Sequence, residues 1–209
     1  MNKEQLAPGI FMYSDACENF EKLSNLIYSD DLRWYPALIA ANRDPSEEIT
    51  DIRPKYNKEI RDCLSVPMLY EKADIQYFAN LSPDEEPADL WIEIHDIIRP
   101  MFDKIEKDYL VDHEIDYMTW HSRLEILKYE AGHFFENHID NIPGILRTVS
   151  VVYYLNDDYE GGELFFERFN LSIKPKANSM IVFPSNYVYN HSAEPVISGT
   201  KIAIASFLA

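Results

Sequence analysis

The spacing of hydrophobic residues changes at about residue 118, and this change divides the chain into two differently patterned parts. Before this point, apolar side chains recur every three or four positions, which is the spacing of one helix face. After it, short apolar runs separated by turn residues indicate β-strands. We predict a single domain over residues 1–209, in which residues 1–117 form a helical and irregular N-terminal support and residues 118–209 form the core.

Two amphipathic helices are predicted in the N-terminal part, and Ser14 or Asp15 is the expected N-cap of the first. The apolar face of this first helix consists of Phe20, Leu23, Leu26 and Ile27. The second helix follows a segment at 82–85 that resembles a capping box, and Pro100 is predicted to kink or divide it. Residues 30–80 are less regular and are expected to form short strands and loops, or a cover over a site.

The C-terminal part contains short runs that are rich in β-branched and aromatic residues. These runs span residues 124–129, 149–155, 163–166, 180–183 and 201–207. Gly, Pro, Asn or Asp separates them, as is typical of turns between short strands. The pattern predicts a mainly β fold, a sandwich or barrel, with flanking α-helices packed on one side of it.

The hydrophobic content and net charge of the chain limit the kinds of molecule that it is expected to bind. Hydrophobic residues make up 46% of the chain, which is enough to build a folded core. The formal net charge of -17 repels phosphate backbones, so we expect no nucleic-acid partner. A cationic peptide or protein would be attracted by this charge. Alternatively, the charge only keeps the protein soluble and marks no partner.

Cysteine usage and the N-terminal residues bear on the compartment. Cys17 and Cys63 are the only cysteines, and their spacing fits neither a disulfide framework nor a thiolate zinc site. The chain shows no signal-peptide pattern and no apolar run of membrane-spanning length. We therefore predict a cytoplasmic protein without a membrane partner, and the sequence leaves its oligomeric state open.

A possible metal site is contained in the stretch HFFENHID. His138 and Asp140 are two positions apart, so in an extended segment they project to the same face while Ile139 turns toward the core. His191, after a β run and a turn, is the best candidate for a third ligand. Two histidines and one carboxylate typify non-haem Fe(II) oxygenases, but an HxD tripeptide alone also arises in ordinary acidic surface loops.

Lys201 opens an apolar strand in which Ile202 and Ile204 take one face while Lys201, Ala203 and Ala205 take the other. The lysine can lie on a solvated strand face, as most lysines do. Alternatively, the small alanines leave space for a ligand, and the ammonium faces an anionic group within that space.

Several motifs, taken together, resemble the 2-oxoglutarate and Fe(II)-dependent dioxygenases of the prolyl 4-hydroxylase type. They are Tyr129-x-x-Gly132, His138-x-Asp140, Arg147-x-x-Ser150, Tyr154-Leu-Asn156, Gly161-Gly-Glu-Leu164, Lys174-Pro-Lys176, His191, Pro195-Val196, Gly199 and Lys201. The resemblance covers residues 118–209 and implies a double-stranded β-helix of jelly-roll type. Where the family commonly has Gly-Asp after Lys176, this chain has Asn178-Ser179, and asparagine tolerates the left-handed backbone of that turn.

The resemblance also implies roles for individual residues. His138, Asp140 and His191 would bind Fe(II), and Lys201 would hold the distal carboxylate of 2-oxoglutarate. Tyr129 and Tyr154 would hydrogen-bond that carboxylate or line its pocket, although packing in the core is the alternative for both. O₂ is the implied co-substrate and ascorbate a reductant.

The implied activity is hydroxylation of an unactivated C–H bond with release of succinate and CO₂, and a prolyl residue in a peptide or protein is the expected substrate.

Arg147 is a candidate for contacting substrate near the mouth of the site, or it is part of a surface ion pair. Glu125 is a second candidate, which faces either the cavity or solvent. His133 stays outside the triad and is expected at most to contact substrate. Hydroxylation of a free amino acid or other small metabolite, and a non-catalytic metal-binding interaction module, are the alternatives.

Two adjacent glycines, Gly161 and Gly162, separate two of the predicted strands. Because glycine takes positive φ without steric cost, we assign this pair to turn formation and to no chemical role.

Overall fold

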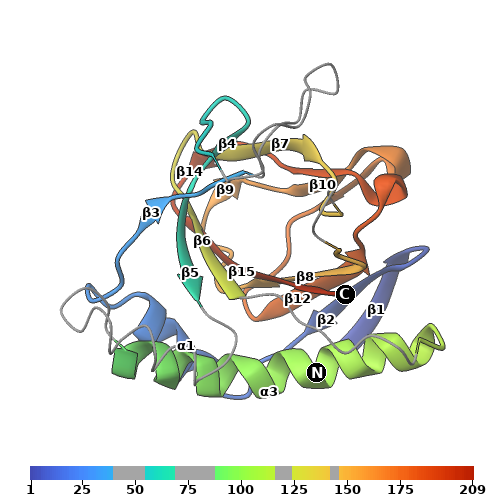
Figure 1. The fold of residues 1–209 in the computed structure, drawn as a ribbon, viewed down its shortest axis with the longest axis horizontal. Helices are drawn as coiled ribbons and strands as arrows, with labels where there is room; N and C mark the ends of the chain where they lie inside the picture. Colours follow the sequence, from blue (N-terminus) through green and yellow to red (C-terminus); the bar gives the residue numbers. More distant parts are fainter. Residues whose placement is uncertain (40–54, 69–87, 116–123, 142–145) are drawn as a thin grey trace.

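The computed structural model describes residues 1–39, 55–68, 88–115, 124–141 and 146–209. Two antiparallel sheets face each other, and helices cover the outer face of the larger one (Figure 1). The fold is thus mainly β with flanking helices on one side, as the hydrophobic pattern predicted, and its two facing sheets have the jelly-roll arrangement that the family resemblance implied. The predicted domain boundary at 117/118 lies outside the described residues.

The larger sheet has eight strands, which pair in the order β1-β2-β12-β8-β15-β6-β5-β3. In this order their bounds are Asn2–Ala7, Ile10–Ser14, Ser179–Pro184, Val149–Tyr154, Lys201–Leu208, Leu124–Tyr129, Leu64–Met68 and Tyr35–Pro36. The predicted runs at 124–129, 149–155, 180–183 and 201–207 are therefore confirmed as strands of one sheet.

The smaller sheet has five strands in the order β11-β10-β13-β7-β4. Their bounds are Leu171–Ile173, Leu164–Phe166, His191–Ala193, Phe134–His138 and Arg61–Asp62. A third, two-stranded sheet joins β14 (Val196–Ser198) to β9 (Glu160–Gly161), and short 3₁₀ helices span Glu167–Phe169 and Tyr187–Tyr189. The predicted strand at 163–166 is confirmed as β10.

Alternation along the strands separates two environments. On β15, Ile202 and Ile204 join the core beneath the helices, whereas Lys201 and Ala203 line a pocket between the two main sheets. The same alternation on β6 sends Ile126 to the helices and its neighbours to the pocket. We call this cavity the central pocket.

The two longer helices are α1 (Phe20–Ile27) and α3 (Ala88–Asp112). Their apolar faces pack on the large sheet, where Ile98 and Phe102 of α3 are fully buried. The helix runs without division through Pro100, which is exposed, because the buried residues on both sides hold its two halves on the same sheet. The predicted capping box at 82–85 lies outside the described residues.

The first fourteen residues differ from the sequence prediction, which gave this region no strands. They form the hairpin β1–β2, and β2 pairs with β12. Ser14 therefore belongs to a strand and Asp15 has φ of 54°, so neither caps α1. The N-cap of α1 is Asn19, without a side-chain capping bond. No helix among the described residues combines the length and apolar character that crossing a membrane requires.

Candidate functional site

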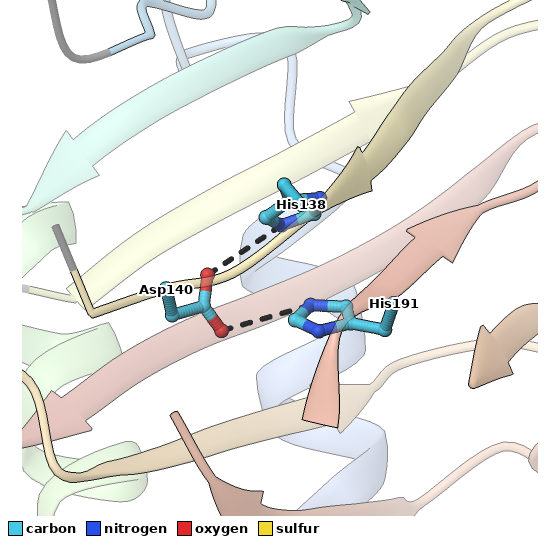
Figure 2. A group of neighbouring side chains, drawn as sticks. All are labelled: His138, Asp140 and His191. Carbon is cyan, nitrogen blue, oxygen red and sulfur yellow. Dashed lines mark ion pairs between the residues drawn. The ribbon is translucent and has the colours of Figure 1, made fainter. Parts of the chain in front are cut away.

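The small sheet brings the two predicted histidine ligands together at one end of the central pocket. His138 ends β7, His191 begins β13, and the two residues are directly paired across the antiparallel ladder. Asp140 follows β7 by two residues and places one carboxylate oxygen toward each imidazole (Figure 2). One donor atom from each of the three residues lies within 4.8 Å of the others. The structure therefore assembles the predicted triad from two strands that are far apart in sequence.

Backbone carbonyls fix how the two imidazoles are turned. His138 Nδ1 lies 2.7 Å from the carbonyl oxygen of Glu136, and His191 Nδ1 lies 3.0 Å from that of Tyr189. Because a carbonyl only accepts, each Nδ1 carries the hydrogen and each Nε2 presents a lone pair to the centre of the triad.

The separations within the triad suit an interposed cation. His138 Nε2 lies 3.5 Å from one Asp140 oxygen, and His191 Nε2 lies 3.6 Å from the other. Both distances exceed those of good N–H···O hydrogen bonds, so the inward-facing atoms are not bonded to one another. Two imidazole nitrogens and a carboxylate oxygen directed at one point are the donor set of a ferrous facial triad.

Neighbouring groups determine the protonation states of the Asp140 carboxyl and the His138 imidazole. Burial alone would raise the pKa of Asp140, but His191, His138 and the Ser150 hydroxyl together hold the pKa of this carboxyl well below its usual range. Ser150 Oγ donates to Asp140 Oδ2 at 2.6 Å, and Ser185 Oγ lies 2.7 Å from Ser150 Oγ. Burial, with His191 nearby, lowers the pKa of His138 to about 4, which leaves a neutral imidazole available to a metal.

Aromatic side chains enclose both histidines. The Phe135 ring stacks on His138 with centroids 3.7 Å apart, and the Phe183 ring meets His191 edge-on at 4.8 Å. These rings shield the imidazoles from solvent on the sides that do not face Asp140.

Lys201 lies in the same pocket, on the opposing sheet. Only 2% of its surface is exposed, and its ammonium donates to the carbonyl oxygen of Gly162 at 2.6 Å. Among the described residues no other hydrogen-bond acceptor of Lys201 is found, so a carboxylate can take the remaining N–H donors. Burial lowers the pKa of Lys201 to about 8. The reading of Lys201 as a solvated lysine is therefore wrong.

Tyr129 and Tyr154 flank this ammonium. The Lys201 nitrogen lies 5.0 Å from the ring centroid of Tyr129 and 5.5 Å from that of Tyr154. Both rings line the central pocket, and burial raises the pKa of each phenol well above its ordinary value. Both phenols therefore stay protonated at neutral pH and can donate to an anion.

The two residues proposed for substrate also line the central pocket. Arg147 stacks on Phe207, with its guanidinium carbon 3.8 Å from the ring centroid. Glu125 faces the pocket from β6 and forms an ion pair with Arg61, the closest nitrogen and oxygen being 3.5 Å apart.

Arg61 is a pocket residue that sequence reasoning missed. It lies in the two-residue strand β4, within a region that shows no clear hydrophobic period. Only the pairing of Arg61 with Phe135 on β7 brings its side chain to the pocket. No local motif marks it, so this contact could be found only from the arrangement of the strands.

Four local expectations have definite outcomes. Gly161 and Gly162 take φ of 69° and 67°, and Asn178 takes 61°, so the predicted positive-φ positions are confirmed. Ile139 does not turn into the core but is half-buried and lines the central pocket. His133 accepts a hydrogen bond from the Glu130 amide in a turn and does not line this pocket.

Comparison with known proteins locates the matching segment. Residues 124–209 match the model of the 2OG-Fe(II) oxygenase superfamily. A PKHD-type hydroxylase of Prochlorococcus marinus is 39% identical over 77 residues, which are 34% of this chain and 34% of that protein. Human prolyl 3-hydroxylase 2 is 39% identical over 64 residues, which are 28% of this chain and 9% of that protein. The chain thus covers a third of the first relative and less than a tenth of the second.

A solved structure supports the fold over a longer stretch. A prolyl hydroxylase from Trichoplax adhaerens, in complex with an oxygen degradation domain peptide fragment of hypoxia inducible factor, covers 96% of this chain and 83% of its own. The TM-score is 0.66 and the sequence identity is 18%, so this likeness concerns the fold alone. The sequence match to the 2OG-Fe(II) oxygenase superfamily model is therefore confined to residues 124–209, and the likeness over most of the chain is one of fold.

Proposed function

We propose that this protein is an Fe(II)- and 2-oxoglutarate-dependent hydroxylase that acts on a prolyl residue in a peptide or protein. The reaction consumes O₂ and 2-oxoglutarate, releases succinate and CO₂, and leaves a hydroxyl group on a previously unactivated carbon. Ascorbate is the reductant we expect to sustain turnover.

One observation carries this proposal: a buried His-Asp-His triad and a buried lysine share the central pocket. A ferrous ion chelated by an α-keto acid supplies the oxidising chemistry of such enzymes. The chain supplies a three-donor face for the ion and, at Lys201, a cation for the far end of a dicarboxylate. A metal site with a purely structural role would need only the triad, and it would give no reason for a buried lysine in the same pocket.

Each residue then has a definite role. His138, Asp140 and His191 hold Fe(II), with Ser150 restraining the Asp140 carboxylate through its hydrogen bond. Lys201 binds the distal carboxylate of 2-oxoglutarate, and the phenols of Tyr129 and Tyr154 line that end of the pocket. Their burial keeps bulk water from competing for the anion.

A prolyl substrate is supported by the relatives. The similar stretch of human prolyl 3-hydroxylase 2 and the fold of the Trichoplax adhaerens prolyl hydroxylase both belong to proteins named for acting on proline. The latter was solved with a peptide fragment, and we extend this kind of substrate to the present chain.

The cofactor assignment is tested by anaerobic titration of Fe(II) and 2-oxoglutarate, followed through their visible charge-transfer band. The unaltered protein should develop the band, and His138→Ala and Asp140→Ala should lose it. His133→Ala is the matched control, because this histidine lies in the same segment but outside the central pocket. Variants at 138 and 140 that bind like the parent would show that the metal site has been misassigned.

The substrate class is tested by mass spectrometry for the gain of one oxygen atom. A library of prolyl peptides and free L-proline are offered separately to the Fe(II)- and 2-oxoglutarate-loaded protein. Product from peptides supports the proposal, whereas product from free proline alone indicates an amino-acid hydroxylase. Cofactor binding without product or succinate from any substrate would favour a non-catalytic module.

A further inference from the structure

The ion pair between Arg61 and Glu125 lies in the central pocket, beyond the residues given to iron and cofactor. The Arg61 side chain is 8% exposed and that of Glu125 is 18% exposed, so both charges are largely removed from water. Burying such a pair is costly unless hydrogen bonds satisfy it well. Their separation of 3.5 Å is longer than a charge-assisted hydrogen bond, so neither group is fully satisfied by the other.

The guanidinium is anchored near the proposed metal ligands. Its Nη1 donates to the Leu38 carbonyl oxygen at 2.8 Å, and its central carbon lies 4.8 Å from the centroid of the Phe135 ring. The same Phe135 ring stacks on His138. Arg61 and the imidazole of His138 thus lie against one phenylalanine ring, which places Arg61 within reach of a substrate held at the iron.

Arg61 also keeps a hydrogen-bond donor unused. Its Nε is buried and has no hydrogen-bond partner among the described residues. A buried guanidinium N–H without an acceptor is unfavourable, because the group has lost water and gained nothing in return. In a residue that lines a pocket, such a donor indicates a place for an oxygen atom of a ligand.

The place for this ligand oxygen, beside Arg61, is far from the end of the pocket where Lys201 would hold the distal carboxylate of 2-oxoglutarate. On β6, Tyr129 faces Lys201 and Glu125 faces Ala205 across the ladder to β15. Four residues of strand separate Glu125 from Tyr129, which is roughly 13 Å at the usual rise. Arg61 is held toward the Glu125 end by their ion pair, so the two cations serve different groups.

We infer that Arg61 is a substrate-binding residue, which donates to an oxygen acceptor next to the carbon that is hydroxylated, and that Glu125 positions it. This inference rests on the proposed function. The acceptor is a peptide carbonyl in a prolyl peptide or the carboxylate in free proline, and both offer the same oxygen chemistry. The second oxygen of Glu125 is suited to an N–H group of the same substrate.

The test is steady-state kinetics on Arg61→Gln, with a blocked prolyl peptide from the library and with L-proline as separate probes. Loss of a hydrogen bond to a charged group should raise KM about 10- to 100-fold for the probe that uses it. The dissociation constant of 2-oxoglutarate, measured through the visible band, should stay within about twofold. Which probe responds identifies the source of the acceptor oxygen. Arg168→Gln, at an exposed arginine outside the pocket, is the matched control.

The double variant Arg61→Gln/Glu125→Gln guards against misfolding, because it leaves no buried charge unpaired. It should show the same rise in KM, while Glu125→Gln alone should raise KM less because the guanidinium remains. A KM equal to that of the parent, or weaker binding of 2-oxoglutarate, would overturn the substrate-binding role of Arg61 but would leave the proposed prolyl hydroxylation untouched. A parent protein that hydroxylates neither probe would overturn the prolyl function and this assignment with it.

Discussion

At the scale of single residues, the role proposed for Lys201 requires a buried charge that lowers stability. Burial lowers its pKa from 10.5 to about 8, so the folded state disfavours the charged form relative to the unfolded chain. The penalty is fully present below pH 8 and disappears as pH rises toward 10.5. Lys201→Met should therefore raise the free energy of unfolding of the ligand-free protein at pH 7, by up to about 3 kcal/mol. Urea unfolding at pH 7 and at pH 10 measures this gain, which should shrink at the higher pH.

The same shift predicts how cofactor affinity depends on pH. The ammonium of Lys201 is protonated below pH 8 and neutral above it, and only the protonated form attracts a carboxylate. Affinity for 2-oxoglutarate should be constant between pH 6.5 and 7.5 and fall toward tenfold per unit above about 8. Titrations of the visible band at several pH values measure it. An affinity that is flat to pH 9 would mean that another group holds the distal carboxylate.

Lys201→Met supplies the companion measurement, with Lys128→Met as control. Lys128 lies on the same pair of strands but does not line the central pocket. The first variant should bind 2-oxoglutarate about 10- to 100-fold more weakly at pH 7 and lose the dependence above pH 8. The control should keep both the parent affinity and its pH profile.

In the proposed metal site, Ser150 would act only through Asp140, to which it donates a hydrogen bond. Ser150→Ala removes a buried donor 2.6 Å from the Asp140 carboxylate, so this ligand loses part of its orientation. Affinity for Fe(II) should fall about 10- to 100-fold, the usual effect of losing such an outer hydrogen bond. The visible band again reports it. Ser179→Ala is the control, because Ser179 is equally buried but its hydroxyl has no partner among the described residues and it does not line the pocket.

At the scale of elements, α3 carries a proline that its packing tolerates. Pro100 removes a backbone donor from the helix interior and crowds the preceding turn, yet its side chain is exposed and contributes little packing. Pro100→Ala should raise the free energy of unfolding by about 1–3 kcal/mol. Thermal and urea unfolding measure it, and Lys104→Ala at another exposed position should change stability by less than about 0.5 kcal/mol. A destabilised Pro100→Ala would mean that the proline shapes the helix to fit the sheet.

Strand elements differ in how far the sequence predicts them. Residues 124–129 and 201–207 alternate between a helix-covered face and a pocket face, and this alternation identified both strands and the face that carries Lys201. The strand Asn2–Ala7 was missed because it is mostly polar and exposed and has a partner on one side only, so it carries no buried stripe. Arg61 was missed because its place depends on register with β7, which no local pattern encodes.

The proposed metal site shows the same contrast between what local spacing predicts and what strand pairing decides. The spacing of His138 and Asp140 within one extended segment predicts that they share a face. The ladder that sets His191 against His138 joins residues more than fifty positions apart, so the residues alone made His191 only a candidate. The resemblance to a known family supplied that pairing in advance, and the structure shows its physical basis in β7 and β13.

At the scale of the whole molecule, two charge patterns meet at the pocket. The chain as a whole carries a formal charge of -17, whereas the central pocket contains Lys201, Arg61 and Arg147 beside Glu125 and Asp140. A long-range acidic field thus surrounds a site that is locally suited to anionic groups. The two patterns act at different ranges, because salt screens exposed charges beyond about 8 Å while buried groups are screened much less.

This difference predicts how peptide substrates are selected. A prolyl peptide flanked by lysines should have a higher kcat/KM than its glutamate-flanked counterpart at about 20 mM NaCl, by roughly tenfold, because the acidic field steers its approach. The advantage should largely vanish at about 0.5 M NaCl, where the field is screened, while a serine-flanked peptide changes little. Stopped assays of peptide hydroxylation across this salt series measure the effect. A glutamate-flanked peptide that is preferred at low salt would show that Arg61 and Arg147, rather than the net charge, dominate recognition of the residues beside the proline.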